Sequence, residues 1–442
     1  MDKRQGYCMK KAIINVIIYD FARFLSNGFV VFDTTILQVG DMNEFVDDGY
    51  EIIDGKGMLL MPGLVCAHTH IYSTFARGLS LPFNPKNFQE MLDQMWWKLD
   101  RQIDNETSYY SGIVAGAEFL RNGVTTVIDH HASGQEINGS LASLKKAVCD
   151  EAGLRALLAF EVSDRFDVGV AIKENATFIK NFKTPFVAGL FGLHASMSLS
   201  EETLRQVKDN LDVAPIHIHV AESLMDEEDA LNKYSERVVA RLDRHGLINQ
   251  DSLLVHCVHV NDDELDIIKK RQATIVVNVT SNMNNAVGLP DIVKFQAHDI
   301  PVMIGNDGLS SGIANEYMNT LYATHLLKKS PTAFGLGQLL AMINNGYDYV
   351  SRHLGVKLGR IQNGYEADML LVPYVAPTKL DENNVLGHFF YGMAHAFKPK
   401  DVFVNGKQLV SDYQLTNQKL ILEYEKSHEI AQKLWSRIKG EK

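Results

Sequence analysis

The sequence predicts an α/β fold: a (β/α)8 barrel of the TIM type, with a small β-sandwich built from both chain ends. The first observation is an alternation, between about residues 58 and 310, of short β-rich runs with polar, periodic segments of helical length. The second is that polar side chains gather at the C-terminal ends of these runs, where barrel enzymes carry their active sites. The third is that no GxGxxG motif follows the first run, as a competing doubly wound sheet would favour.

Eight strand-like runs match the eight strands of such a barrel: residues 58–70, 124–130, 156–162, 186–194, 215–220, 252–258, 273–279 and 300–305. Helices are expected between them, for instance at residues 105–122, 141–152, 201–210, 228–245 and 262–271. Gly123, Gly153 and Gly246 follow three of these segments, and glycine just past a helix is a common stop signal.

The two chain ends have a different pattern. Residues 9–57 and 355–375 contain strand-like runs and turns, and residues 401–410 resemble a hairpin around an Asn-Gly turn. We therefore expect residues 1–60 and 355–442 to form one composite β-sandwich, with an amphipathic helix at the C-terminus, and residues 61–354 to form the barrel. Met1 and Met9 both offer a translation start.

Composition favours a reduced, cytoplasmic protein. The 442 residues are 46% hydrophobic and 22% charged, and no apolar run approaches the roughly 18 residues of a membrane span. The four cysteines form no CxxC pair. A net charge of −11 argues against nucleic-acid and anionic-membrane partners. The expected partner is a small molecule, and the sequence is compatible with a homodimer.

The most informative motif is His68-Thr69-His70, at the end of an apolar strand-like run. Side chains two residues apart leave a strand on the same side, so both imidazoles can bind one cation. An isolated His-x-His pair is more often inert. Whether this pair binds a metal therefore depends on the side chains at the other strand ends.

Those strand ends supply the complementary groups. The fifth run ends with His219 and Glu222, the sixth with His256, and the eighth with Asp307 between an asparagine and a glycine. Three histidines and one carboxylate leave room for water on a divalent cation, which is the arrangement of a catalytic site. A bound metal lowers the pKa of such a water to about 7.

Four motifs resemble the amidohydrolase superfamily: PGLVCAHTH at residues 62–70, IHVAE at 218–222, LVHCV at 254–258 and GNDG at 305–308. The similarity is strongest to the branch of cytosine, guanine and adenosine-type deaminases and triazine chlorohydrolases. Within it, the SsnA aminohydrolase subgroup is most similar, through residues 67–78, 125–133, 191–196 and 281–288. The resemblance covers essentially the whole chain.

The resemblance implies specific roles. His68, His70, His219 and Asp307 would bind the metal, and Asp307 would also accept a proton. Glu222 would shuttle protons, His256 would polarise the substrate or hold the water, and His194 would contact the substrate. Relatives with two metals carry a bridging lysine at the fourth strand end. Here that position has no lysine, which implies one metal ion: zinc is favoured, with iron and manganese as alternatives.

Two further residues are substrate-binding candidates. His131, after the second strand, could contact the substrate, hold a neighbouring side chain by a hydrogen bond or cap a loop. Arg77, seven residues after His70, could clamp an anionic or carbonyl group, or form a surface salt bridge.

The predicted function is hydrolysis of a C–N bond other than a peptide bond, by deamination of an amino-substituted purine- or pyrimidine-like heterocycle. The first alternative keeps the same site and opens a cyclic amide or displaces chloride. The second is a non-catalytic protein that holds a metal within an oxidoreductase assembly.

Overall fold

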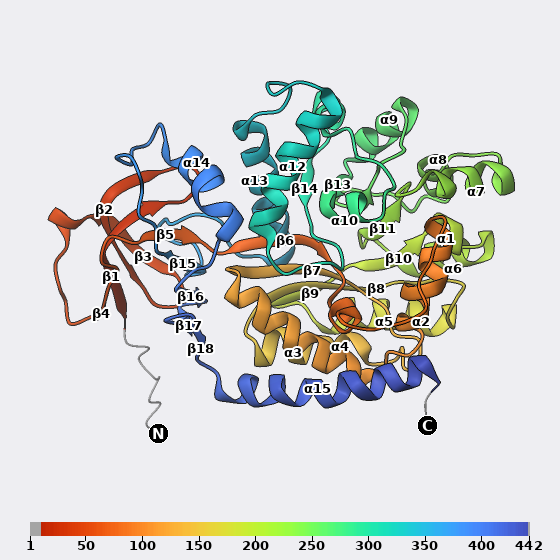
Figure 1. Ribbon diagram of the computed structural model, residues 1–442, viewed down its shortest axis with the longest axis horizontal. Helices are drawn as coiled ribbons and strands as arrows, with labels where there is room; N and C mark the ends of the chain where they lie inside the picture. The colour runs from red at the N-terminus through yellow and green to blue at the C-terminus, as the bar shows by residue number, and fades with distance from the viewer. Residues whose placement is uncertain (1–9, 441–442) are drawn as a thin grey trace.

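The computed structural model describes residues 10–440, so Cys8 and the alternative starts at Met1 and Met9 lie outside the described residues. A barrel of parallel strands and surrounding helices makes up most of the molecule, and a sheet from both chain ends lies beside it (Figure 1). Within residues 10–440, no helix combines the length and apolar character needed to cross a membrane.

The barrel strands pair in parallel and in chain order. One sheet has the order β6-β7-β8-β9 and the other β10-β11-β12-β13-β14. Their bounds are β6 Leu64–Thr69, β7 Val124–His131, β8 Arg155–Phe160, β9 Val187–Gly189, β10 Phe191–Ala195, β11 Ile216–Val220, β12 Leu253–His256, β13 Thr274–Val277 and β14 Val302–Ile304.

Backbone contacts connect the two sheets at both edges. Thr69, at the end of β6, forms a parallel bridge with Asp307, just beyond β14. On the other side, Val162 bridges Leu193 of β10. The strands therefore follow one another around a barrel, as predicted, and the predicted fourth strand is divided at Leu190 into β9 and β10, which pair with different neighbours.

Helices alternate with these strands and cover them. They are α1 Phe88–Met91, α2 Trp97–Asp100, α3 Asn105–Arg121, α4 Ser140–Lys145, α5 Val168–Asn181, α6 Glu201–Leu211, α7 Leu224–Tyr234, α8 Val238–Arg244, α9 Asp262–Arg271, α10 Val279–Asn284, α11 Ile292–Ala297, α12 Ile313–Lys328 and α13 Leu336–Leu354. The helix predicted at residues 228–245 is wrong as one element, because Ser235 has a left-handed backbone with φ of 59° and ends α7.

Strands from both chain ends form one continuous sheet. From the N-terminal end come β1 Lys11–Tyr19, β2 Phe24–Phe32, β3 Ile36–Asp41, β4 Glu51–Asp54 and β5 Leu59–Pro62, and from the C-terminal end β15 Met369–Val372, β16 Asp401–Val404, β17 Lys407–Ser411 and β18 Gln414–Leu415. β5 joins the halves, since it pairs with β1 on one side and with β15 on the other.

The predicted first strand, residues 58–70, is therefore two strands with different partners. β5 belongs to the terminal sheet and β6 to the barrel, and the chain passes between them at Gly63. The expected boundary at residue 60 falls inside β5. The division of the chain into two units stays a prediction.

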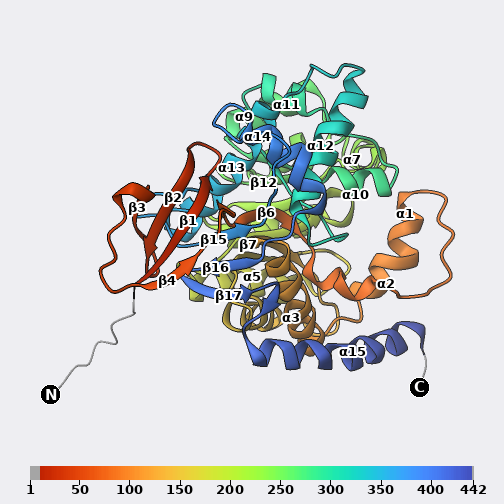
Figure 2. The ribbon, with the colours of Figure 1, turned by 60° about the vertical axis from the view of Figure 1, so that its left-hand side comes forward.

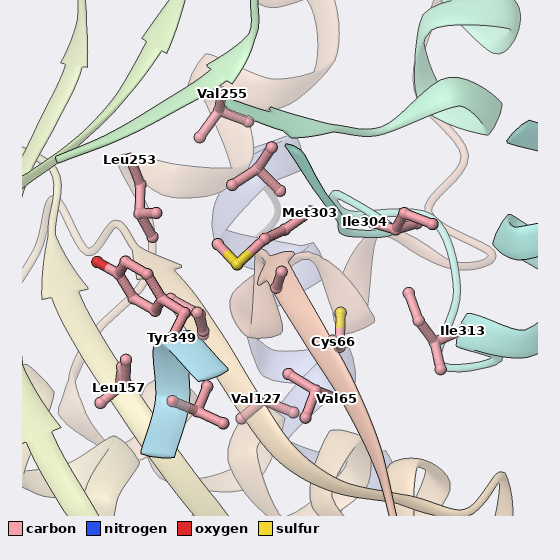
Figure 3. Close-up of a cluster of buried hydrophobic side chains, with 14 of the residues drawn as sticks. Val65, Cys66, Val127, Leu157, Leu253, Val255, Met303, Ile304, Ile313 and Tyr349 are labelled. Atoms are coloured by element: carbon pink, nitrogen blue, oxygen red, sulfur yellow. The ribbon is translucent and has the colours of Figure 1, made fainter. Parts of the chain in front are cut away.

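Apolar side chains fill the space between the barrel strands and their helices. Val65, Val127, Leu157 and Met303 are fully or almost fully buried, and they come from four different strands (Figure 3). The expected C-terminal helix is α15 Gln418–Lys439, which lies along α3 in both ribbon views (Figures 1 and 2). A short helix, α14 Val385–Gly387, precedes β16.

A buried arginine connects the barrel to the terminal sheet. Arg155, the first residue of β8, is fully buried. Its Nε lies 2.8 Å from Asp368 Oδ2, and its Nη2 lies 2.7 Å from Glu366 Oε2. Asp368 directly precedes β15, so these ion pairs join the bottom of the barrel to the sheet from the chain ends.

We expect Arg155→Leu to lower the free energy of unfolding by about 3–5 kcal/mol, because removing one partner of a buried ion pair leaves the other charge buried alone. Urea unfolding followed by circular dichroism measures this. Arg352→Leu is the control, since its ion pair with Asp251 is exposed and worth about 1 kcal/mol or less. Equal losses in the two variants would contradict a structural role for the buried pair.

Candidate active site

The two histidines of the opening motif lie where β6 leaves the sheet. His68 is fully buried inside the barrel, and His70 follows the last residue of the strand. Their rings are 4.8 Å apart, centroid to centroid, because one residue separates them and both project toward the same side. The alternation of a strand therefore places both imidazoles at one point, as predicted.

Asp307 reaches the same point from the eighth strand. Gly305 permits this approach: a Cβ atom there would lie 2.7 Å from the Cβ of His68 and 2.4 Å from Asn278 Oδ1, so a side chain does not fit. Asp307 itself has φ of 55°, a left-handed backbone that costs energy in most residues and is concentrated at functional sites. His256 and Ala221, next to Glu222, share this conformation at 72° and 46°.

The distances among four ligand atoms fit one tetrahedral metal ion. His219 Nε2 lies 3.2 Å from His70 Nε2 and 3.4 Å from His68 Nε2. Asp307 Oδ1 lies 3.0 Å from His70 Nε2 and 3.5 Å from His68 Nε2. Ligands at about 2.0–2.1 Å from a tetrahedral centre are roughly 3.3 Å from one another, so these spacings suit a zinc-sized ion.

The charges also fit a cation. Burial lowers the pKa of His68 to about 3 and that of His219 well below its ordinary value, which keeps both imidazoles neutral with a free lone pair. Burial disfavours a proton on His70 as well, but the Asp307 carboxylate outweighs it and raises the pKa of His70 to about 9. The cluster therefore requires one positive charge, which a proton or a metal ion can supply.

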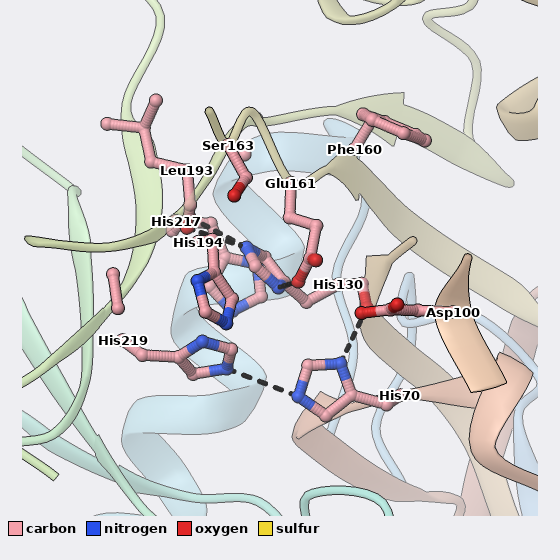
Figure 4. A network of polar contacts seen from close by, with 12 residues as sticks. His70, Asp100, His130, Phe160, Glu161, Ser163, Leu193, His194, His217 and His219 are labelled. Atoms are coloured by element: carbon pink, nitrogen blue, oxygen red, sulfur yellow. Dashed lines mark hydrogen bonds and ion pairs between the residues drawn. The ribbon is translucent and has the colours of Figure 1, made fainter. Parts of the chain in front are cut away.

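Surrounding groups fix the orientation of the ligand rings (Figure 4). His70 Nδ1 donates to the His130 carbonyl oxygen at 2.7 Å, so its Nε2 is left unprotonated for a metal. His68 Nδ1 lies 2.8 Å from Nε2 of His217, which is fully buried one layer deeper in the barrel. His130 Nε2 donates to the carbonyl oxygens of Leu193 and His217. Such partners orient metal-binding histidines and raise their affinity.

Alternative groupings of ligand atoms exist around the same centre. Those of His68, His219, His256 and Asp307 lie within 4.8 Å of one another, as do those of His70, His130 and His219. The Nε2 of His130 is engaged by carbonyl oxygens, and the Nδ1 of His256 by the Asn282 amide at 2.9 Å. These two histidines are therefore better placed beside the centre than on it.

Glu222 and His256 meet next to the cluster. Glu222 Oε2 lies 3.5 Å from His256 Nε2, and Oε1 accepts from Asn285 Nδ2 at 3.2 Å. Because the Asn282 amide donates to His256 Nδ1, the ring proton of His256 is on Nε2 and faces Glu222. Burial raises the pKa of Glu222 against the opposing effect of His256.

These groups line one end of a cavity that opens to solvent. His70, His219, Glu222, His256 and Asp307 all face it, and His194 lies further along its wall. His68 is the one predicted residue of the cluster that does not line the cavity. Its side chain is fully buried behind the cavity wall. A concave site with an apolar lining and a few convergent polar groups is typical of small-molecule binding.

Two predicted substrate contacts lie elsewhere in the described structure. His131 is fully buried on the outer side of β7, where its Nε2 lies 3.0 Å from Ser108 Oγ of α3. Arg77 forms a two-point ion pair with Glu118, 2.8 Å and 2.9 Å long, and does not line the cavity. The prediction that these side chains bind substrate therefore has no support, and the alternatives of structural hydrogen bond and salt bridge fit them.

No role was predicted from the sequence for the groups that hold Asp307, His256 and Glu222 in place. Ser281 Oγ donates to Asp307 Oδ2, while Asn282 and Asn285 hold His256 and Glu222. All three lie on or directly after α10, which follows the seventh barrel strand. All three residues lie in the motif at residues 281–288. This motif contributes to the resemblance to the family, but the resemblance implies no role for it.

The barrel, the histidine cluster and the open cavity define a metal-dependent hydrolase of the barrel type. Residues 59–409 match the Amidohydrolase family, and the chain belongs to that family. The expected relationship is thus confirmed.

Individual relatives cover almost the whole chain. The 5'-deoxyadenosine deaminase of Methanocaldococcus jannaschii is 27% identical over 420 residues, which are 92% of this chain and 95% of the relative. An adenosine deaminase from Xanthomonas campestris with bound zinc has a similar fold, with a TM-score of 0.82 and 23% identity over 96% of this chain and 99% of that one. The structure of atrazine chlorohydrolase TrzN from Arthrobacter aurescens, complexed with zinc, is also similar. It has a TM-score of 0.78 and 20% identity, over 95% of this chain and 99% of that one.

The His217 contact generates a prediction about metal affinity. We expect His217→Leu to weaken zinc binding about 10–100-fold, since removing the hydrogen-bond partner of a metal-binding histidine has an effect of this size. Competition with a chromophoric chelator measures the affinity. His428→Leu, at an exposed position of α15, is the matched control and should leave affinity unchanged. Unchanged affinity in a folded His217→Leu protein would show that this contact does not support the site.

Proposed function

We propose that this chain is a zinc-dependent aminohydrolase, which removes an amino group from a purine- or pyrimidine-like heterocycle as ammonia. The observation that carries the proposal is the meeting of Glu222 and His256, at 3.5 Å, beside four candidate metal ligands in one cavity. The deaminase relatives support the same reaction class.

His68, His70, His219 and Asp307 would hold the metal. When bound there, it would lower the pKa of a water molecule and so supply a nucleophile near neutral pH. Iron or manganese could serve the same ligand set, since imidazole and carboxylate suit several first-row metals. Asp307, whose Oδ2 accepts a hydrogen bond from the Ser281 hydroxyl, would take up a proton at that oxygen.

Glu222 is the proton donor to the substrate. Burial favours its protonated form, and its carboxyl faces the cavity where the ring would lie. A proton delivered to the ring nitrogen next to the reacting carbon makes that carbon more electrophilic. The same carboxylate can then collect a second proton and deliver it to the departing amine.

His256 stabilises the charge that develops on the ring. Its Nε2 carries a proton because Nδ1 is engaged by Asn282, so the imidazole can donate toward the cavity. A preorganised donor that faces developing negative charge is among the most effective contributions to catalysis. A Glu222–His256 pair therefore provides one proton for transfer and one hydrogen bond for stabilisation.

The proton-transfer groups favour deamination over displacement of chloride. An amine needs protons in order to leave, whereas chloride leaves without one, and Glu222 is placed to supply them. Opening of a cyclic amide would use the same groups and is the second candidate. Membership of a hydrolase family with a complete set of these groups disfavours a non-catalytic role in an oxidoreductase assembly.

The partner and location follow the same reasoning. We infer that the partner is a small heterocycle and that the protein works in the cytoplasm. Cys66, Cys149 and Cys257 are buried free thiols, which suits a reducing compartment. A homodimer stays a prediction.

We expect Glu222→Gln to lower ammonia release from a panel of aminopurines and aminopyrimidines by about 100-fold or more, because general acid–base catalysis typically contributes this much. Coupled detection of ammonia measures the rate, and metal analysis should show one zinc per chain in both proteins.

Glu202→Gln is the control for this experiment, since Glu202 is exposed and contacts only its surface neighbours Arg205, by an ion pair, and Gln206, which donates a hydrogen bond to it. Its activity should equal that of the unaltered protein. Full activity of zinc-loaded Glu222→Gln would exclude the proton-transfer role, and products released without ammonia would favour ring opening.

A further inference from the structure

A buried glutamate outside the cavity connects two helices that reach the candidate site. Glu316 lies in the first turn of α12 and is only 2% exposed. It does not line the cavity that contains Glu222 and Asp307, and the proposed reaction does not use it. Glutamate is seldom fully buried unless other groups satisfy its carboxyl oxygens, so the partner of Glu316 indicates what this side chain does.

That partner is Thr280, in the first turn of α10. Glu316 Oε2 accepts from the backbone N–H of Thr280 at 3.4 Å, and the carboxyl group also meets the Thr280 hydroxyl. The same hydroxyl oxygen accepts from Asn319 Nδ2 at 2.7 Å, so its own proton is available to Glu316. Asn319 follows Glu316 by three residues on one face of α12, and both side chains therefore hold one residue of α10.

No side chain next to α10 in the sequence caps this helix. Asn278 precedes it, and asparagine is a preferred capping residue, but its side chain forms no hydrogen bond with the first turn. The Asn278 side chain is fully buried beyond the end of β14 instead, where a Cβ atom on Gly305 would lie 2.4 Å from its Oδ1. The first N–H groups of a helix need acceptors, and Glu316 supplies one from a neighbouring helix.

Glu316 also suits the start of its own helix. Gly312 precedes α12 and offers no capping side chain. A carboxyl group in the first turn of a helix interacts favourably with the positive end of the helix dipole. Glu316 lies in the first turn of α12 and against the first turn of α10, so one side chain stabilises the beginnings of both helices.

The placement of these two helices matters because both are connected to the proposed reacting groups. α12 follows Asp307 after the short loop of residues 308–312. α10 and the residue after it carry the three side chains that hold Asp307, His256 and Glu222 by hydrogen bonds. A shift of α10 against α12 would therefore displace all three groups at once.

Glu316 and Thr280 can influence the reaction without meeting the substrate. Neither side chain lines the cavity, so a change at either position leaves every group that faces the substrate chemically intact. Such a change alters where those groups lie. A misplacement of about 1 Å can lower the rate of an enzyme about 100-fold.

We propose that Glu316 is a positioning residue: through Thr280 it fixes α10, and through α10 it fixes the side chains of Asp307, His256 and Glu222. This rests on the proposed function, which assigns these three side chains to the reaction. The contact needs an acceptor oxygen rather than a charge. Burial raises the pKa of Glu316 to about 7 against the opposing effect of Thr280, and a neutral carboxyl group or a carboxamide still offers an acceptor.

The first test compares a variant that removes the acceptor with one that keeps it. We expect Glu316→Leu to lower kcat for ammonia release about 100-fold, because the reacting groups lose their placement. KM should change less than about threefold, since the cavity wall is unaltered. Glu316→Gln has an acceptor oxygen at the same reach, and its kcat should stay within about fivefold of that of the unaltered protein.

Thr280 allows a smaller change at the same contact. Thr280→Val removes the hydroxyl at nearly constant volume and should lower kcat about tenfold, the size of one hydrogen bond to a charged group. Thr280→Ser keeps the hydroxyl and should restore the rate. Glu316→Leu combined with Thr280→Val should be no slower than Glu316→Leu alone, because both act through one contact. The Thr280 variants decide the question if Glu316→Leu fails to fold.

Glu174→Leu is the matched control. Glu174 is a buried glutamate that accepts from the backbone N–H groups of Gly139 and Leu141, at 2.8 Å and 3.0 Å, where α4 begins. It does not line the cavity. Its removal should lower the free energy of unfolding in urea much as Glu316→Leu does, while kcat stays unchanged.

Cobalt-substituted protein gives a measurement that does not depend on the reaction. The visible absorption bands of bound Co²⁺ report the geometry of its ligands, and Asp307 is a proposed ligand. We expect Glu316→Leu and Thr280→Val to shift these bands. Glu316→Gln, Thr280→Ser and Glu174→Leu should leave them unchanged.

Three outcomes would overturn the positioning role: full kcat in folded Glu316→Leu and Thr280→Val proteins, a kcat as low in Glu316→Gln as in Glu316→Leu, or an equal loss of kcat in Glu174→Leu. The cobalt bands keep the two proposals apart. Bands that shift as expected in a protein that releases no ammonia refute the reaction alone. Ammonia release and bands that are both insensitive to every variant refute the positioning role alone.

Discussion

The site depends on one constraint: a carboxylate and several imidazoles are enclosed together inside a barrel, and they must share one positive charge. Asp307 cannot stay ionised in this setting without a cation, and burial keeps His68 and His219 neutral. A metal ion satisfies the carboxylate and the lone pairs at once. The histidines behind the cluster, His130 and His217, keep those lone pairs turned toward the centre.

The backbone contact that closes the barrel also brings the predicted metal ligands together. The bridge between Thr69 and Asp307 connects the first and last barrel strands, and it lies between the two histidines of the β6 motif. Gly305 lets these strands approach, and left-handed backbones at His256 and Asp307 turn the chain at the strand ends. These left-handed backbones cost free energy. The packing of the barrel strands and the contacts among the side chains at the strand ends compensate for it. At the opposite end of the barrel, Arg155 performs a structural task with another buried charge.

The sequence predicts the site well where the alternation of side chains along a strand and the order of the barrel strands determine the structure. It predicts less where contacts between distant segments determine it. Strand alternation suffices to bring His68 and His70 together, and barrel order adds His219 and Asp307. It does not settle which of His130 and His131 points inward, because neighbours on a strand face opposite sides and a shift of one residue exchanges them. His130 faces the barrel interior, and His131 contacts α3. The contact between Glu316 and Thr280 could not be predicted either, since the two residues come from separate helices with no fixed spacing. The continuity of the terminal sheet through β5 depends on pairings between both chain ends, which local patterns do not encode.

Anomalous diffraction from crystals of the zinc-loaded protein, measured on both sides of the zinc edge, is the most direct measurement of the central claim. We predict one anomalous peak per chain, about 2.0–2.2 Å from Nε2 of His68, His70 and His219 and from a carboxylate oxygen of Asp307. A peak coordinated instead by His130 or His256, a second peak in the same cavity, or no peak in fully folded protein would contradict the account.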